Sequence, residues 1–296
     1  MRVTHQTIVS QTILDMQRNL SRVEATREDV ASGRRLSRPS DDPVDVFRAL
    51  GFRNKASGIA QHMRNIDLVL ARLNQTESVL ASTNDALIQL KQLSLQLATG
   101  PTIDTLDRVN AIEQVQQFKE QITQFANTRS GNQFIFAGSN TRTRPYEASG
   151  DQVLYKGNTA EISIEVEDNN TVPINIPGIR VFDTSANGIF QMLDDFKAAL
   201  EQDNTVALRE IMESIDTQTE VALNARSTNA ARTQRLEISR DRLFDDSIDT
   251  TEALSQTEDV DLAQAITEFA DQQNAYQASL SSTARAIQPS LLSVLG

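Results

Sequence analysis

The sequence contains no cysteine and no tryptophan, and among its 296 residues only 7 are proline, 2 are histidine and 5% are aromatic. The absence of cysteine excludes disulfides, thiol chemistry and thiolate metal sites. No apolar run approaches the roughly 18–20 residues that cross a membrane, so we expect no membrane partner. The first residues also lack the apolar segment of a secretory signal peptide.

Residues suited to catalysis or metal binding are scarce. The two histidines, His5 and His62, lie in helical patterns where an exposed position is expected. Two carboxylate clusters, Asp41–Asp42 and Glu258–Asp259–Asp261, fall at predicted helix starts, where negative charge is favourable without any catalysis. No glycine-rich loop follows a strand in a phosphate-binding arrangement. We therefore predict that the protein is not an enzyme and has no catalytic residue, cofactor or metal site.

The charge and amide content indicate long helices and a protein partner. The net charge of −12 argues against nucleic acid. Residues 1–60 contain 10 basic and 7 acidic side chains, whereas residues 241–296 contain 2 basic and 10 acidic ones. The two ends are thus complementary in sign, which favours their pairing. The 25 glutamines and 18 asparagines are typical of helices with amide-covered faces.

Both ends of the chain show narrow apolar stripes at alternating spacings of three and four residues, which is the pattern of a coiled-coil seam. A stripe this narrow requires a partner helix, so we expect the two segments to meet, and we predict that they form the self-assembly seam. The seam residues are Val9, Ile13, Met16, Leu20, Val23, Val30, Leu262, Ile266, Phe269, Tyr276, Leu280 and Ile287.

Between the first two predicted helices, 5–31 and 43–98, lies an elbow. Gly33 can adopt the left-handed conformation that ends a helix, and Pro39 disfavours helical geometry at Arg38. Asp42 is a suitable N-cap and Pro43 a suitable first residue for the second helix. The elbow and cap residues are therefore Gly33, Arg38, Pro39, Asp41, Asp42 and Pro43.

The middle of the chain changes from helix to strand and back. A third helix, capped by Thr102 or Asp104, is expected to end near 130, and the alternating patterns of 134–182, which open with a strand at 134–138, predict β-structure. Helices resume at 186 and continue to about 254. Residues 255–258, Ser-Gln-Thr-Glu, have the pattern of a capping box for the last helix.

The predicted fold is mainly α with a small inserted β domain, and its N- and C-terminal segments form a long antiparallel helical bundle or coiled coil. We predict three parts. Residues 1–42 with 256–296 are terminal assembly segments, disordered in the free monomer. Residues 43–132 with 186–255 form a helical bundle, and residues 133–185 form the β domain.

Several of these segments resemble the flagellin superfamily over nearly the whole chain. The elbow sequence Arg-Pro-Ser-Asp-Asp-Pro at 38–43 is closer to the hook-associated members than to filament flagellins. Residues 133–139, 153–158 and 178–182 are similar to markers of the β domain in those members, and 255–266 resembles the start of the C-terminal assembly helix. The ending Ser-Val-Leu-Gly at 293–296 is instead closer to filament flagellins, which leaves a short flagellin as an alternative.

The resemblance implies a structural subunit of the bacterial flagellum that is exported by the flagellar type III system and links the hook to the filament. Its implied partners are further copies of itself, hook-associated protein 1 on the hook side, flagellin on the filament side and an export chaperone in the cytoplasm. A non-flagellar coiled-coil scaffold or signalling protein is the more distant alternative. The absence of a membrane span and the presence of the β insert weigh against it.

Overall fold

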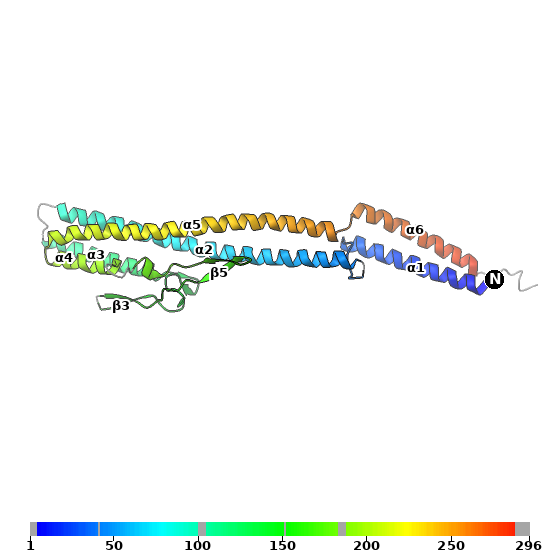
Figure 1. Cartoon of the computed structure of the whole chain (residues 1–296), viewed down its shortest axis with the longest axis horizontal. Coiled ribbons are helices and arrows are strands. Elements are labelled where there is room, and N and C mark those ends of the chain that lie inside the picture. The colour runs from blue at the N-terminus through cyan, green and yellow to red at the C-terminus, as the bar shows by residue number, and fades with distance from the viewer. Residues whose placement is uncertain (1–4, 41, 100–104, 151, 183–187, 288–296) are drawn as a thin grey trace, which may run out of the picture. The chain divides into compact units, whose positions relative to one another are not determined.

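The computed structural model describes residues 5–40, 42–99, 105–150, 152–182 and 188–287. The chain divides into two compact units, Met1–Gly58 with Asp246–Gly296 and Ile59–Asp245. The long helices α2 (Pro43–Thr99) and α5 (Thr205–Glu258) each contribute residues to both units. The prediction of a mainly α fold with a small β insert is confirmed (Figure 1).

The Ile59–Asp245 unit contains two shorter helices besides its parts of α2 and α5. These are α3 (Thr105–Ala126) and α4 (Ile189–Glu201). α4 and α5 are separated at Asp203, whose φ of 57° lies in the left-handed region. α3 ends four residues earlier than the sequence suggests, because the side chain of Asn127 donates to the carbonyls of Thr123 and Tyr146 and the chain turns there.

The core of this unit joins the helices to the β segment. Phe136, Tyr146 and Phe182 of the β segment are fully buried together with Phe196 of α4. The rings of Phe136 and Phe182 meet edge to face with centroids 5.0 Å apart, a favourable aromatic geometry. The β segment therefore shares its apolar interior with the helices that flank it in sequence.

The β segment consists of short antiparallel pairs in the described part of the chain. β1 (Arg129–Ser130) pairs with β2 (Gln133–Phe134), and β3 (Tyr146–Ser149) pairs with β4 (Gln152–Tyr155). β5 (Ser163–Glu167) pairs with β6 (Asn170–Pro173). A short 3-10 helix, η1 (Gly178–Arg180), follows them.

Two expectations about the strands are wrong in detail. The apolar run 134–138 is a strand only at its first residue, because Gly138 has a φ of +67° and lies directly against Asn158, which ends the extended conformation. Residues 174–177, which belong to the segment predicted as β-structure, lie outside β6. Ile174 still donates to the carbonyl of Ile162, but the Asn175 side chain takes over the next contacts with the facing segment.

Tyr155 offers a test of how β4 is attached to the core. Its hydroxyl lies 2.8 Å from the carbonyl oxygen of Asn158 and 3.1 Å from that of Phe136. We expect Tyr155→Phe to lower the free energy of unfolding by about 1–2 kcal/mol, because a part-buried carbonyl loses its donor. Thermal and urea unfolding measure this difference. A variant as stable as the parent protein would show that water replaces the hydroxyl without loss.

In the other unit, α1 (His5–Ser32) and α6 (Leu262–Ile287) lie side by side (Figure 1). The expected pairing of the two terminal segments is therefore confirmed. The same unit contains the elbow between α1 and α2, the first turns of α2 and the last turns of α5.

The predicted start of the last helix is wrong. α5 continues through Ser255 to Glu258, and α6 begins at Leu262. The N-cap is Asp261, whose Oδ1 accepts from the backbone N–H groups of Ala263 and Gln264. Residues 255–258 cannot form a capping box, because they are the last turn of a helix rather than the first.

Candidate functional site

At the elbow the chain is non-helical twice, once between α1 and α2 and once between α5 and α6. Gly33, with a φ of +70°, ends α1 in the expected left-handed conformation. The carbonyl of Gly33 accepts from the N–H of Val260 at 3.0 Å, and the N–H of Arg35 donates to the carbonyl of Glu258 at 2.8 Å. A two-residue bridge, Arg34 to Asp259, thus joins the break after α1 to the break after α5.

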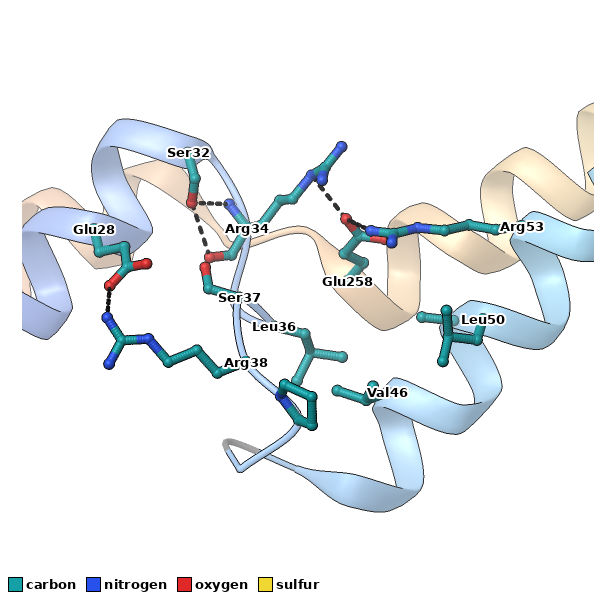
Figure 2. Close-up of a pocket in the computed structure, with 12 residues that line it drawn as sticks. Glu28, Ser32, Arg34, Leu36, Ser37, Arg38, Val46, Leu50, Arg53 and Glu258 are labelled. Carbon is teal, nitrogen blue, oxygen red and sulfur yellow. Dashed lines mark hydrogen bonds and ion pairs between the residues drawn. The ribbon is translucent and has the colours of Figure 1, made fainter.

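Glu258 is the central charged residue of the elbow. Its side chain is only 3% exposed, and it lies 2.7 Å from Arg34 Nε and 2.5 Å from Arg53 Nη2. Arg53 Nε also donates to the second carboxylate oxygen at 3.1 Å. Figure 2 shows the carboxylate between the two arginines. A buried carboxylate is stable only when it is paired in this way, so Arg34, Arg53 and Glu258 form one cluster, which we call the elbow clip.

Two further arginines connect the elbow to its neighbours. Arg35 donates to Asp45 at 2.8 Å and to the carbonyl of Thr257 at 3.0 Å. The hydrogen bond from Arg35 lowers the pKa of the Asp45 carboxyl. Arg38, one of the predicted elbow residues, pairs with Glu28 of α1 at 2.7 Å. Every basic residue between α1 and α2 therefore has an acidic partner in the structure.

The start of α2 has the geometry of an N-cap. Asp42 Oδ1 accepts from the N–H of Val44 at 2.9 Å and from that of Asp45 at 3.1 Å, and Pro43 is the first helical residue. Asp41 lies outside the described residues. The predicted role of Asp42 as the N-cap of α2 is therefore confirmed.

The cap can be tested by two substitutions at Asp42. Asp42→Ala should lower the free energy of unfolding by about 0.5–2 kcal/mol. Asp42→Asn keeps an acceptor oxygen, so the free energy of unfolding should change by only a few tenths of a kcal/mol. Thermal unfolding of the isolated protein measures both. If Asn and Ala were equally destabilising, the charge of Asp42 rather than its cap would matter.

The terminal helix pair buries a different stripe of α6 from the predicted seam. Ala265 and Thr283 are each 5% exposed, and the half-buried positions follow the same alternating spacing. These half-buried positions are Phe269, Gln272, Tyr276 and Ser279. The partner face of α1 is similarly mixed, with half-buried Met16, Asn19, Val23 and Thr26. The two helices therefore meet along a narrow and partly polar interface.

Several predicted seam residues stay exposed beside this interface. Leu262, Ile266 and Leu280 are 51%, 55% and 41% exposed, and Leu20 of α1 is exposed as well. The structure places Ile13, Met16, Val23, Val30, Phe269 and Tyr276 in half-buried positions. The side chains of Val9 and Ile287 lie outside the described residues. The assembly role of the whole set remains a prediction.

The residues that sequence reasoning missed are those of the elbow clip. The sequence pattern predicts Glu258 as part of a helix cap and does not distinguish Arg34 or Arg53 from other surface arginines. No local pattern identifies this cluster, because Arg53 and Glu258 are 205 positions apart in sequence. Only the expected pairing of the chain ends indicates, indirectly, that Glu258 comes close to the elbow.

The described part of the chain contains no group of three or more potential metal ligands, and none of its helices is both long and apolar enough to cross a membrane. The expected exposed position of His62 is wrong. Its side chain is only 17% exposed, because it lies against the β5–β6 turn, 3.3 Å from Asp168.

Comparison with known proteins supports a relationship to the flagellins. A model of the bacterial flagellin N-terminal helical region matches residues 3–141, slightly less than half of the chain. The chain is 27% identical to flagellar hook-associated protein 3 of Escherichia coli over 277 residues, which cover 85% of this chain and 86% of the relative. The Salmonella typhimurium protein of the same name is 26% identical, covering 94% and 95%.

Solved structures agree on the fold. A flagellar hook-associated protein of Vibrio parahaemolyticus superposes with a TM-score of 0.70 at 20% identity, covering 74% of this chain and all of that one. The flagellar junction protein FlgL of Legionella pneumophila gives a TM-score of 0.61 at 15% identity, covering 72% and 100%. Both likenesses support the architecture described above.

Proposed function

We propose that this protein is a non-catalytic structural subunit of the bacterial flagellum that links the hook to the flagellin filament. The observation that carries the proposal is the terminal helix pair, which buries a partly polar stripe of α6 and leaves Leu262, Ile266 and Leu280 exposed. Exposed aliphatic residues at helical spacing favour packing against further helices. Relatives of nearly the same length are named flagellar hook-associated protein 3, which supports the junction as the place of assembly.

The proposed partners follow from a position between the hook and the filament. Copies of the same chain pack side by side through the terminal helices, hook-associated protein 1 contacts them on the hook side, and flagellin contacts them on the filament side. Export through the flagellar type III system, with a chaperone in the cytoplasm, delivers the chain to the outside of the cell. A short filament flagellin is the alternative, because flagellar filament proteins also match parts of the chain.

Removal of the gene from the source bacterium tests the proposal. A junction subunit lies between hook and filament, so the deletion should leave hooks without filaments while flagellin accumulates unpolymerised in the medium. Electron microscopy of cells and immunoblots of the medium measure the two quantities. If the chain is the filament subunit, no flagellin should appear in the medium. Normal filaments in the deletion strain would contradict both functions.

A further inference from the structure

The elbow contains a groove of about 470 Å³ next to the elbow clip. Its floor is apolar and is formed by Leu36, Pro39, Val46, Ala49 and Leu50. In Figure 2, Leu36, Val46 and Leu50 converge from the elbow segment and the first turns of α2. Leu36 and Ala49 are buried, but Leu50 is 45% exposed and therefore accessible to an occupant.

The charged groups on the rim are already paired. Arg34 and Arg53 bind Glu258, and Arg38 binds Glu28. An incoming anion would have to displace one of these carboxylates. The groove therefore offers an occupant its apolar floor rather than free positive charge, and it fits an uncharged aliphatic segment.

The chain itself contains such a segment. Residues 288–296, which lie outside the described residues, read Gln-Pro-Ser-Leu-Leu-Ser-Val-Leu-Gly. Four of the five residues from Leu291 to Leu295 are branched aliphatic, and none of the nine is charged. We call residues 291–295 the aliphatic segment.

The aliphatic segment cannot reach the groove of its own copy. α6 begins beside the elbow at Leu262 and ends at Ile287, which places its last residue about 38 Å away at 1.5 Å per residue. Nine fully extended residues span at most about 30 Å, so even Leu295 falls short of the elbow. An aliphatic segment that occupies an elbow groove must therefore come from a different copy of the chain than the groove itself.

We propose that the aliphatic segment of one copy occupies the elbow groove of a second copy. This inference rests on the self-assembly in the proposed function and adds a specific contact to it. The groove lies at one end of the α1–α6 pair and the segment follows the other end. The contact therefore joins two different surfaces, and such a head-to-tail contact repeats from copy to copy into a ring or a helical array.

A labelled peptide tests the contact without requiring assembly. The probe is a fluorescein-labelled peptide with the sequence of residues 286–296, added to dilute full-length protein and followed by fluorescence anisotropy. We expect saturable binding and an affinity at least tenfold weaker with Leu50→Asp, because a carboxylate would enter the apolar floor. Leu106→Asp, at an exposed leucine in the other unit, should leave the affinity unchanged. A peptide with Leu292→Asp and Leu295→Asp should not bind.

Absence of peptide binding, or equal binding to the parent protein and to Leu50→Asp, would overturn the proposal. Cross-linking then extends the test to the assembled state, since the chain has no cysteine of its own. Leu50→Cys and Leu292→Cys proteins, co-assembled and oxidised, should form a disulfide-linked heterodimer, and Leu106→Cys with Leu292→Cys should not. Normal assembly without the heterodimer would refute this contact and leave the proposed function standing. Peptide binding combined with normal filaments in the deletion strain would support this contact and refute the proposed function.

Discussion

Replacement of Glu258 by alanine should lower the stability of the elbow by about 1.5–3 kcal/mol, the range for hydrogen bonds to a charged group, because Arg34 and Arg53 are 55% and 44% exposed and can be solvated by water. The substitution leaves Arg34 and Arg53 without their carboxylate. It also leaves a space between the break after α1 and the break after α5. Amide exchange of Arg35 and Val260 in the isolated protein measures the effect directly, because these two N–H groups make the backbone bridge between the breaks.

Matched variants separate the elbow clip from a general effect of charge. Glu252→Ala removes an exposed carboxylate from the same helix and should change the exchange of these amides little. Replacement of both Arg34 and Arg53 by methionine should cost more than Glu258→Ala, because it leaves a buried carboxylate unpaired. Equal exchange in Glu252→Ala and Glu258→Ala would contradict a structural role for the clip.

Two features of the elbow that depend on neighbouring residues could be predicted from the sequence, whereas the capping box at 255–258, also a local pattern, was wrong. The left-handed position of Gly33 and the start of α2 at Pro43 follow from local backbone chemistry. The pairing of the two ends follows from the spacing of their apolar residues. The elbow clip could not be predicted, because its members come from three separate segments and each looks like an ordinary surface charge in sequence.

The face that α6 turns toward α1 shows a second limit of prediction. Two stripes of α6 have the same alternating spacing and share Phe269, Tyr276 and Thr283. The sequence predicts the stripe with Leu262, Ile266 and Leu280, because its apolar residues follow the alternating spacing of a coiled-coil seam. The structure instead buries the stripe that contains Ala265, where a small side chain allows the two helices to approach closely. The larger residues then remain available to other copies.

The division of the chain into three parts and the disorder of its terminal segments in the free monomer remain predictions. The β segment packs against the helices through Phe136, Tyr146 and Phe182, so its separability needs a direct measurement. Amide exchange of the isolated protein tests whether the terminal segments are disordered in the free monomer. Unprotected amides in α1 and α6, together with protected amides between Ile59 and Leu87, would indicate ends that fold only on assembly.

Leu280→Asp should leave the isolated protein almost as stable as the parent and yet prevent its incorporation into the flagellum. Leu280 is partly exposed on α6, beside the stripe that packs against α1, so its replacement should change the free energy of unfolding by no more than about 1 kcal/mol. In the assembly the same position is expected to be buried against other copies. An unpaired carboxylate there costs several kcal/mol per contact, and incorporation should fall at least about 100-fold, which corresponds to about 2.7 kcal/mol.

Two control variants on the same helix distinguish assembly from folding. Ser282→Asp introduces the same charge on an exposed face away from Leu280 and should preserve both stability and incorporation. Ala265→Asp places the charge inside the α1–α6 interface and should separate the pair, which amide exchange of α6 detects. Motility and the amount of chain in purified flagella, compared at equal cellular levels, measure incorporation. If Leu280→Asp assembles normally, the exposed stripe is not an assembly surface. If it unfolds the pair as Ala265→Asp does, Leu280 stabilises the monomer itself.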